Sequence, residues 1–494
     1  MRLERPSEYK NIFKTTFLFG FVQVFNIIVK VGINKVVAIL LGAEGLGMIS
    51  LFNTSINLVK TGAGLGLSQS AVRDVSEANE CNDQFRSAVI IHIVKRIIYL
   101  TCLLGIGVTI VLSPVLSSYS FGSGEYTLNY IFLSIAVAAI ILNDGQKAIL
   151  TGMRQLKSLA KASMIGALSG LITALPFYYL FGQNGITPSL IVSALTTLAV
   201  STYFVKKIKY QRVVISFRDT LGKSSLMIKM GISLMLLSFL GTFSDLIVSS
   251  YIRHSNGLDM VGYYQAGVTI ISSYFGILIT ALGTDYYPRI SAINKDNIKL
   301  KDAVNTQSEI GLLLACPMVV LFLFMSPWFL EFLYSSDFII SVQYVDYAVL
   351  GTIIIICSNS MGMILLAKQK SSIFLISASL QRILFVAAYI FLYRKWGLTG
   401  LGIGYLCMAV VHYLLMNGIM SFFYRINFNV NVNIKLFITL IFATFAQFAK
   451  DIENPVCKYS AGAFLVISSS IYSYMALIRA MKIDPIAIVR NKLK

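Results

Sequence analysis

Long apolar runs, joined by short polar connections, constrain this sequence more than any other feature. A helix needs ~20 apolar residues to cross the ~30 Å core of a bilayer, and most of the runs have about this length. Only 13% of the 494 residues are charged, too few for the surface of a soluble protein of this size. The sequence therefore predicts an all-α polytopic membrane protein. We expect about fourteen transmembrane helices, near residues 15–41, 44–71, 88–116, 126–147, 158–181, 185–205, 230–252, 259–283, 307–333, 341–366, 372–393, 398–422, 434–450 and 459–480.

The basic residues indicate the orientation of these helices. The formal net charge is +19, but most of the 41 Lys and Arg lie at the termini, in alternate connections and at the helix ends beside them. The opposite side holds five: Arg253, Arg394, Lys395, Lys450 and Lys458. Such asymmetry is the positive-inside pattern, so both termini are predicted to be cytoplasmic. The excess charge is a topology signal, and no nucleic-acid partner is expected.

An internal repeat divides the chain. "GLGMISLFN" (45–53) resembles "DMVGYYQAG" (259–267) when Gly47 is set on Gly262, an offset of 215 residues. The same offset sets "AILTGMRQLK" (148–157) on "MILLAKQKSS" (363–372). The repeated unit contains six helices, an even number, so it predicts two parallel lobes related by a pseudo-two-fold axis along the membrane normal. The predicted parts are an N-terminal six-helix lobe (1–210), a basic cytoplasmic linker (211–229), a C-terminal six-helix lobe (230–425), and two additional helices with a basic cytoplasmic tail (426–494).

These repeated segments carry a family resemblance. Three segments resemble the Wzx-type oligosaccharide-lipid flippases: "LGAEGLGMISLFNTSINLVKTGAGLGLSQSAVRDVS" (41–76), its partner in the predicted helices 230–252 and 259–283, and "ILTGMRQLKSLA" (149–160). That family belongs to the superfamily of the MATE multidrug exporters and the lipid II flippases. The resemblance covers about residues 10–425 and implies a MATE-like bundle with a central cavity. It also implies a polyprenyl-diphosphate-linked glycan as the substrate. The last two helices depart from the common twelve-helix form.

Polar residues within the predicted spans indicate where such a cavity lies. Lys30 and Asn26 share one face of the first helix, and Lys60 and Asn57 share a face of the second. A charge at mid-bilayer costs at least ~2.5 kcal/mol, so these faces should point to protein or water. Adding the offset of 215 to Lys30 gives Asp245, a charge of opposite sign in the second lobe. The residues predicted to line the cavity are Lys30, Lys60, Arg382, Asp245, Asn26 and Asn57.

Each of these residues also has a structural interpretation. A buried Lys30–Asp245 pair could lock two helices together, since each charge relieves the desolvation of the other. Lys60 precedes the glycines of "TGAGLGLS" (61–68), which favour close helix packing. His412 could titrate near neutral pH or simply pack beside Tyr413. Three residues at the predicted cytoplasmic helix ends are expected to contact lipid phosphate or to close a gate: Arg73, Asp74 and Arg289.

The favoured function is flipping of a lipid-linked oligosaccharide, such as an O-antigen or capsule repeat unit, from the cytoplasmic to the outer leaflet of a bacterial inner membrane by alternating access. The predicted cavity holds more cations than anions, as an anionic diphosphate requires, whereas a MATE-type exporter of cationic drugs would favour acidic walls. A membrane glycan polymerase or ligase is a further alternative, but the external connections are short. No catalytic residue, metal or cofactor is predicted. The expected partners are the glycan substrate, membrane lipid, and the polysaccharide polymerase and chain-length machinery.

Overall fold

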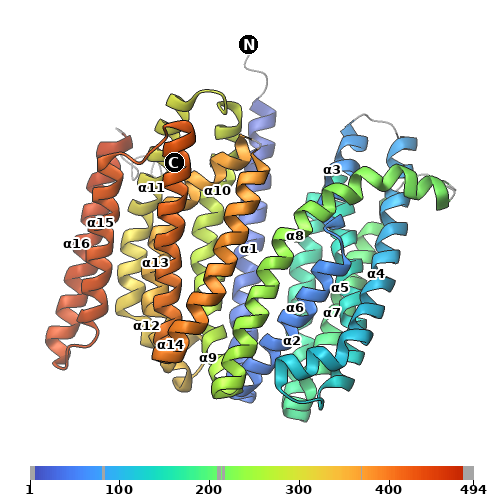
Figure 1. The fold of residues 1–494 in the computed structure, drawn as a ribbon, viewed down its shortest axis with the longest axis horizontal. Helices are drawn as coiled ribbons and strands as arrows, with labels where there is room; N and C mark the ends of the chain where they lie inside the picture. The colour runs from blue at the N-terminus through green and yellow to red at the C-terminus, as the bar shows by residue number, and fades with distance from the viewer. Residues whose placement is uncertain (1–5, 81–83, 209–212, 214–216, 369, 482–494) are drawn as a thin grey trace. The chain divides into compact units, whose positions relative to one another are not determined.

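The computed structural model describes residues 6–80, 84–208, 213, 217–368 and 370–481. These residues are almost entirely helical, which confirms the all-α prediction (Figure 1). Contacts divide the chain into two compact units, Met1–Gly262 and Tyr263–Lys494. The predicted tail after residue 481, and most of the predicted linker before Phe217, lie outside the described residues.

The first unit is built around α5, which packs against α2, α3, α4 and α7. The first and sixth helices pack together, and α8 lies against α2, α3 and α4. The bounds of its elements are α1 Pro6–Leu40, α2 Gly42–Ala63, α3 Leu67–Glu80, α4 Gln84–Phe121, α5 Thr127–Gly152, α6 Leu156–Phe181, η1 Gly182–Gly185, α7 Ile186–Lys206 and α8 Phe217–Asn256; α9, Leu258–Thr269, begins in this unit.

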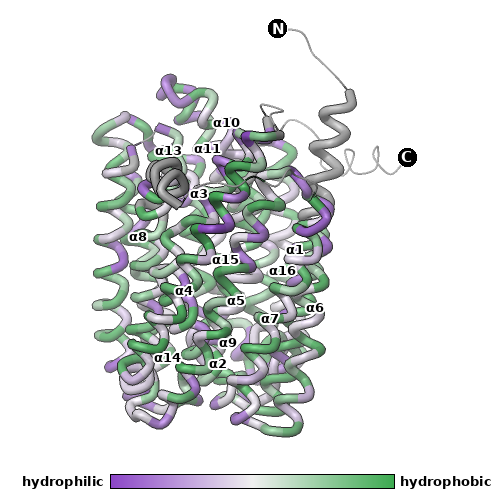
Figure 2. The backbone as a smooth tube through the Cα atoms, turned by 90° about the vertical axis from the view of Figure 1, so that its right-hand side faces the viewer, coloured by the Kyte–Doolittle hydropathy of each residue, from purple (hydrophilic) through white to green (hydrophobic). Residues whose placement is uncertain are grey.

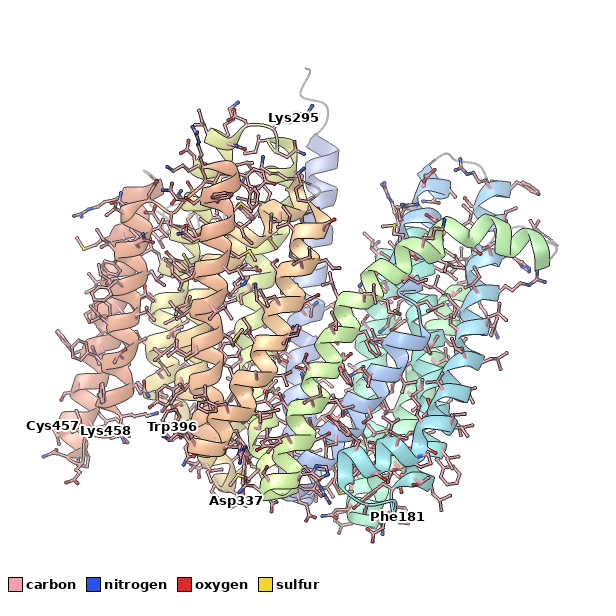
Figure 3. All side chains as sticks on the ribbon, viewed as in Figure 1. Phe181, Lys295, Asp337, Trp396, Cys457 and Lys458 are labelled. Carbon is pink, nitrogen blue, oxygen red and sulfur yellow. The ribbon has the colours of Figure 1, made fainter. Side chains whose placement is uncertain are left out.

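The second unit is built around α13, the most buried of its apolar helices, which packs against α10, α11, α14 and α15. The remaining bounds are η2 Ile270–Phe275, α10 Gly276–Ala292, α11 Asn297–Phe324, α12 Ser326–Leu333, η3 Ser336–Ser341, α13 Val342–Ala367, α14 Ser371–Tyr424, α15 Val430–Ala449 and α16 Pro455–Met481. Asp337, Trp396, Cys457 and Lys458 lie at one end of this unit, and Lys295 lies at the other (Figure 3). This arrangement agrees with the predicted sides of their connections.

Eleven helical stretches among the described residues are long and apolar enough to cross a membrane. Two of them, of 51 and 53 residues, are each about twice as long as the ~20 residues that one crossing needs. Each contains a reversal, so each holds two of the predicted spans. Figure 2 shows hydrophobic residues along most of the helix lengths and hydrophilic residues gathered towards their ends. The chain is a multi-pass membrane protein.

The two reversals have the same backbone geometry. Gly182, between α6 and α7, has φ 55° and ψ −131°, and Gly397, inside α14, has φ 56° and ψ −134°. Both values lie in a region that residues with a side chain rarely adopt. The two glycines are 215 residues apart, the offset of the sequence repeat. This equivalence supports the repeat locally, whereas the symmetry of the whole lobes stays a prediction.

A reciprocal contact joins α2 to the first turn of α9. A Cβ on Gly47 would lie 2.2 Å from the Leu258 carbonyl oxygen, and a Cβ on Gly262 would lie 2.0 Å from that of Ala43. Residues 43 and 47 are related to 258 and 262 by the same offset of 215. Reciprocal contacts of this kind are expected where two equivalent helices cross about a two-fold axis.

Two predicted boundaries differ from the structure. The second predicted span, 44–71, is interrupted after α2, and the chain then continues as α3 to Glu80. The next helix of interest, α8, starts at Phe217, inside the predicted linker, and packs within the first unit. The repeat predicts that the same helix opens the second lobe. The contacts between residues therefore divide the chain after Gly262, whereas the sequence repeat begins the second lobe at residue 230.

The additional helices α15 and α16 pack against α11 of the second unit. Lys435 of α15 forms an ion pair with Glu309 of α11. At the other end of α15, Lys450 forms an ion pair with Asp346 of α13, and these residues are only 6% and 7% exposed. The Ser326 hydroxyl lies 3.3 Å from both charged groups. The two helices are thus tied to the second unit at both ends of α15.

Candidate functional site

A polar cavity of about 240 Å³ lies in the first unit where α2 gives way to α3. We call it the Lys60 cavity. Its other walls come from α4, α5 and α8, and they include Asp144 of α5 and Ser238 of α8. Its lining is completed by Thr61, Gly64, Gly66, Leu67, Ser68, Gln69, Ile98, Thr101, Ile141, Gly145 and Met235.

The helix break that forms this cavity follows from the glycine-rich sequence. Leu65 and Gly66 both have positive φ, 51° and 61°, so the helix cannot continue through them. A Cβ on Gly66 would lie 2.2 Å from the Gly231 carbonyl oxygen of α8, and one on Gly231 would lie 2.4 Å from that of Leu65. The sequence favoured close packing of the glycines at 62, 64 and 66, and the structure shows a close backbone approach to α8 at Gly66. An interrupted helix exposes backbone groups, which membrane proteins accept where the break lines a cavity or is buried in protein.

Lys60 and Asp144 form an ion pair inside this cavity. The Lys60 Nζ atom lies 3.0 Å from Asp144 Oδ2, and the two side chains are 29% and 31% exposed. Each charge offsets the cost of placing the other within the membrane region. Both remain accessible from the cavity, so they can exchange this contact for contacts with a polar ligand.

The second unit contains a larger cavity of about 400 Å³ between α13 and α14, which we call the Arg382 cavity. Its polar lining comes from Asn359 and Ser377 together with Gln381, Arg382, Tyr405 and His412. The apolar lining consists of Ile355, Gly362, Phe374, Ala378, Phe385, Met408, Ala409 and Met416. Arg382 is the one side chain in this lining that is charged at every physiological pH.

Contacts within the Arg382 cavity orient its two basic groups. The guanidinium carbon of Arg382 lies 5.7 Å from the centre of the Phe385 ring. Among the described residues, Arg382 forms no ion pair with a carboxylate. The Nδ1 atom of His412 lies 3.0 Å from Gln381 Oε1. Because the amide oxygen can only accept, this contact places a proton on Nδ1 and leaves Nε2 as an acceptor.

The other predicted cavity residues lie in the first unit. Lys30 on α1 and Asp245 on α8 both have exposed side chains, and neither is in the described lining of the Lys60 cavity. Asn57 is also exposed. The Oδ1 atom of Asn26 is buried and has no hydrogen-bond partner among the described residues. The pairing of Lys30 with Asp245 stays a prediction.

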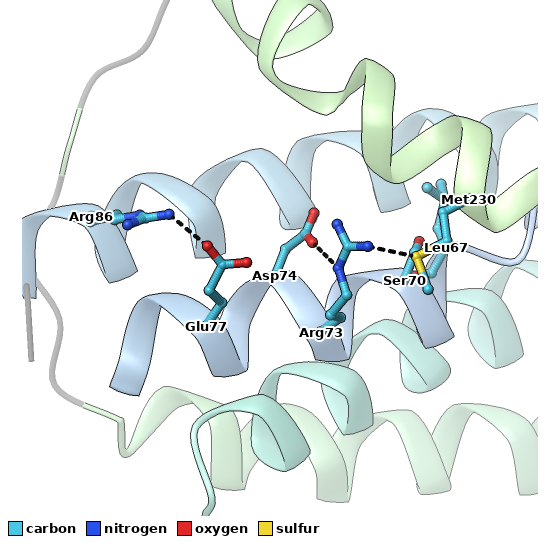
Figure 4. Close-up of polar contacts among 7 residues, drawn as sticks. All are labelled: Leu67, Ser70, Arg73, Asp74, Glu77, Arg86 and Met230. Atoms are coloured by element: carbon cyan, nitrogen blue, oxygen red, sulfur yellow. Dashed lines mark hydrogen bonds and ion pairs between the residues drawn. The ribbon is translucent and has the colours of Figure 1, made fainter. Parts of the chain in front are cut away.

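The predicted gate residues form contacts within their own units, and Figure 4 shows those of Arg73 and Asp74 in the first unit. In the first unit, Arg73 Nε lies 3.1 Å from Asp74 Oδ1 and donates through Nη1 to the Met230 sulfur. Arg73 and Asp74 line a further cavity of about 390 Å³ between α3, α4 and α8. In the second unit, Arg289 donates to Gln307 Oε1 at 3.1 Å. Their roles as a gate or as lipid contacts stay predictions.

Two polar residues of the cavities, Gln381 and His412, had no predicted site, and Asp144 was expected near the cytoplasmic end of its helix, as a wetted residue, a turn cap or a further cavity anion. Asp144 lies 84 residues from Lys60, and no periodicity links the two positions. Gln381 and His412 lie on opposite sides of the reversal at Gly397, so their contact requires the folded hairpin. The local signal was a polar or basic residue inside an apolar run, which all three provide.

Comparison with known proteins identifies the family of this chain. The family model described as "Polysaccharide biosynthesis protein" matches residues 36–343, more than half of the sequence. The chain belongs to this polysaccharide biosynthesis family. Among curated proteins, none matches its sequence. The described residues contain no cluster of three or more His, Cys, Asp or Glu that could hold a metal ion.

Solved structures show the fold of this polysaccharide biosynthesis family member. The lipid II flippase MurJ, in an inward closed conformation, is 15% identical with a TM-score of 0.71, and the match covers 94% of this chain and all of that one. An inward-facing MATE multidrug transporter is 17% identical with a TM-score of 0.64, over 81% of this chain and 94% of that one. A MOP superfamily transporter from Pyrococcus furiosus is 17% identical with a TM-score of 0.59, over 83% and 96%. The fold is therefore MATE-like and MurJ-like, and these neighbours are transporters rather than enzymes.

Proposed function

We propose that this protein is a flippase that moves a polyprenyl-diphosphate-linked oligosaccharide from the cytoplasmic to the outer leaflet of a bacterial inner membrane. The substrate is an O-antigen, capsule or exopolysaccharide repeat unit. Membership in a polysaccharide biosynthesis family supports the glycan, and the fold supports transport across a membrane.

The observation that carries the proposal is Arg382. This guanidinium lies in the middle of a membrane-length helix, lines a cavity, and has no carboxylate partner among the described residues. A charge within the membrane region is energetically costly, so its presence points to a function. A cation at this position suits an anionic diphosphate. The Lys60 cavity adds a second polar chamber of hydroxyl, amide and paired charged groups, which suits sugar hydroxyls.

The proposed mechanism is alternating access of the two lobes, as in other transporters built from parallel repeats. The glycan and the diphosphate pass through the polar interior while the polyprenyl tail stays in the bilayer. The cytoplasmic position of both termini, and cooperation with a polysaccharide polymerase and chain-length machinery, belong to the same proposal.

A reconstituted system tests this function. Purified protein is placed in vesicles that carry a short-chain isoprenyl diphospho-oligosaccharide in both leaflets, and a glycosidase in the outside solution reports the fraction it can reach. We expect the wild type to raise this fraction above one half, because flipping delivers substrate from the inner leaflet. Arg382→Glu should leave it near one half, since a carboxylate repels the diphosphate.

The MATE-like fold supports a second candidate, export of cationic drugs. Vesicles loaded with a fluorescent organic cation distinguish the two functions. Transport of the cation without flipping of the glycolipid would replace the flippase proposal with the exporter.

A further inference from the structure

The Arg382 cavity differs chemically from the Lys60 cavity. In the Lys60 cavity the cation is already paired with the Asp144 carboxylate at 3.0 Å. Among the described residues, the lining of the Arg382 cavity has no Asp or Glu, and its amides, hydroxyls and aromatic rings surround one arginine and one histidine. An anion therefore meets the Asp144 carboxylate in the first cavity, and no carboxylate in the described lining of the second.

The two basic groups of the Arg382 cavity have different proton chemistry. Arg382 is always charged, and its planar fork of donors suits the oxygens of a phosphate. An unperturbed imidazole gains or loses a proton between about pH 5 and pH 8, and His412 supplies this group to the cavity. Its Nδ1 proton is directed at Gln381 Oε1, so an added proton goes to Nε2 and turns that atom into a second donor.

We propose that the Arg382 cavity binds the diphosphate of the substrate, and that His412 takes up one proton from solution as the diphosphate binds. This inference rests on the proposed function and adds the site and a linked proton to it. Arg382 supplies the permanent positive charge. His412 supplies a charge that exists only while the anion is present.

The linkage follows from the groups that face His412. Arg382 and Tyr405 are the other titratable groups in the described lining, and α13 contributes Ile355, Asn359 and Gly362, which carry no charge. Without an anion, Arg382 disfavours a second positive charge in the same cavity. The negative charges of a bound diphosphate outweigh the repulsion from Arg382 and stabilise the protonated imidazolium of His412. Substrate and proton therefore bind together, and release of the substrate returns the proton.

Binding measurements on the full-length protein test the inference. The probe is a short-chain isoprenyl diphospho-N-acetylglucosamine, a diphosphate diester that has no ionisation near neutral pH. Its affinity is measured from about pH 5.5 to about pH 8, a range that brackets an ordinary imidazole. We expect the affinity of the wild type to fall as the pH rises, with a slope of at most ~tenfold per pH unit for one linked proton. The same lipid and sugar joined without the diphosphate should bind weakly and without this slope.

Two variants separate the roles of the basic groups. Arg382→Gln should lose at least ~tenfold in affinity at every pH, the effect of removing a charged hydrogen-bond donor. His412→Gln should bind with the lower affinity that the wild type shows at high pH, with no slope. Lys299→Gln removes a cation from α11, outside the cavity, and should behave like the wild type. All proteins are first compared by thermal unfolding.

Calorimetry of the wild type provides a measurement that needs no variant. Titrations in two buffers with different ionisation enthalpies give the number of protons taken up, which we expect to approach one near neutral pH. A value of zero, or a pH slope that persists in His412→Gln, overturns the inference. Loss of binding in Lys60→Gln with intact binding in Arg382→Gln would move the diphosphate to the first unit. Failure of the flippase proposal looks different, because binding would be intact while glycolipid is not flipped.

Discussion

Lys60 Nζ on α2 lies 3.0 Å from Asp144 Oδ2 on α5, and the pair lines a cavity beside the break between α2 and α3. Neither charge is fully buried, so each is available to a ligand. The pair can hold α2 against α5, present charges to the glycan, or do both. Substitutions can separate these roles, because stability depends on the presence of a pair and recognition depends on where each charge lies.

We expect Lys60→Met to lower stability by about 1–3 kcal/mol, because Asp144 loses its partner. The exchange Lys60→Asp with Asp144→Lys should recover most of this stability, since an opposite pair is formed again. Flipping should stay below the wild-type rate, because the charges now lie at the wrong positions for the glycan. Thermal unfolding and the vesicle assay measure the two effects. Full flipping by the exchanged protein would show that the pair only holds the helices together.

Much of the fold follows from the sequence because membrane spans are local. Length, hydropathy and the positive-inside pattern require no knowledge of partners, and the offset of 215 reappears in the matching geometry of Gly182 and Gly397. The break after α2 was predicted only as a packed glycine face. Its cause is tertiary, since the chain at Gly66 turns where Gly231 of α8 approaches it. A single sequence does not reveal that neighbour.

The candidate site was predicted less completely, for the same reason. Lys60 and Arg382 stand out as charges within apolar runs, and the structure places each in a cavity. Their contacts come from distant segments, Asp144 for one and the His412–Gln381 pair beside the other. The sequence favoured packing for His412 because it stands alone among apolar neighbours. Folding of α14 back on itself brings it to the same cavity as Arg382.

The contact between the helix break and α8 predicts the effect of a single methyl group. Gly231→Ala would place a Cβ 2.4 Å from the Leu65 carbonyl oxygen, so the backbone must move. We expect a loss of about 1–3 kcal/mol, the usual cost of overpacking, with reduced flipping because the Lys60 cavity is distorted. Gly107→Ala is the matched control, since nothing lies within 4 Å of its Cβ. Equal unfolding temperatures for the two variants would contradict this close approach.

The buried pair at the end of α15 predicts a role for the additional helices. Lys450→Met leaves the Asp346 carboxylate buried without its cation, and removing one partner of such a pair costs about 3–5 kcal/mol. We therefore expect low abundance in the membrane. Adding Asp346→Leu should restore abundance, because the pair is then replaced by apolar groups. Lys458→Met, at the exposed start of α16, is the control and should have no effect. Normal abundance of Lys450→Met alone would rule out this anchoring role.

The distribution of basic residues predicts the topology. A reporter enzyme that folds only outside the cytoplasm should be active when fused after Gly122 and inactive when fused after Lys223. A fluorescent protein that folds only in the cytoplasm should give the opposite result at both sites. Activity of one reporter at both positions would contradict the assignment of both termini to the cytoplasm.

Lys30 remains the most informative single position on α1. Its side chain is exposed in the middle of a membrane-length helix, and an ammonium group there requires water, a counter-charge or a ligand. We expect Lys30→Ala to abolish flipping while the protein stays folded and abundant, because the diphosphate loses a cation on its path. Lys30→Glu should be at least as harmful, since it repels both the substrate and Asp245. Lys35→Ala, nearer the end of α1, is the matched control and should flip normally.

A double substitution decides whether Lys30 binds substrate or locks a helix. If Lys30 and Asp245 only stabilise each other, Lys30→Ala lowers abundance by leaving a carboxylate without its partner, and Lys30→Met with Asp245→Leu restores both abundance and flipping. If Lys30 serves the substrate, the same double variant is abundant and inactive, because no apolar side chain replaces the cation. Protein level in the membrane and glycan at the cell surface are measured in one strain. Full surface glycan from the double variant would make Lys30 a structural residue and would leave recognition of the diphosphate to the Arg382 cavity.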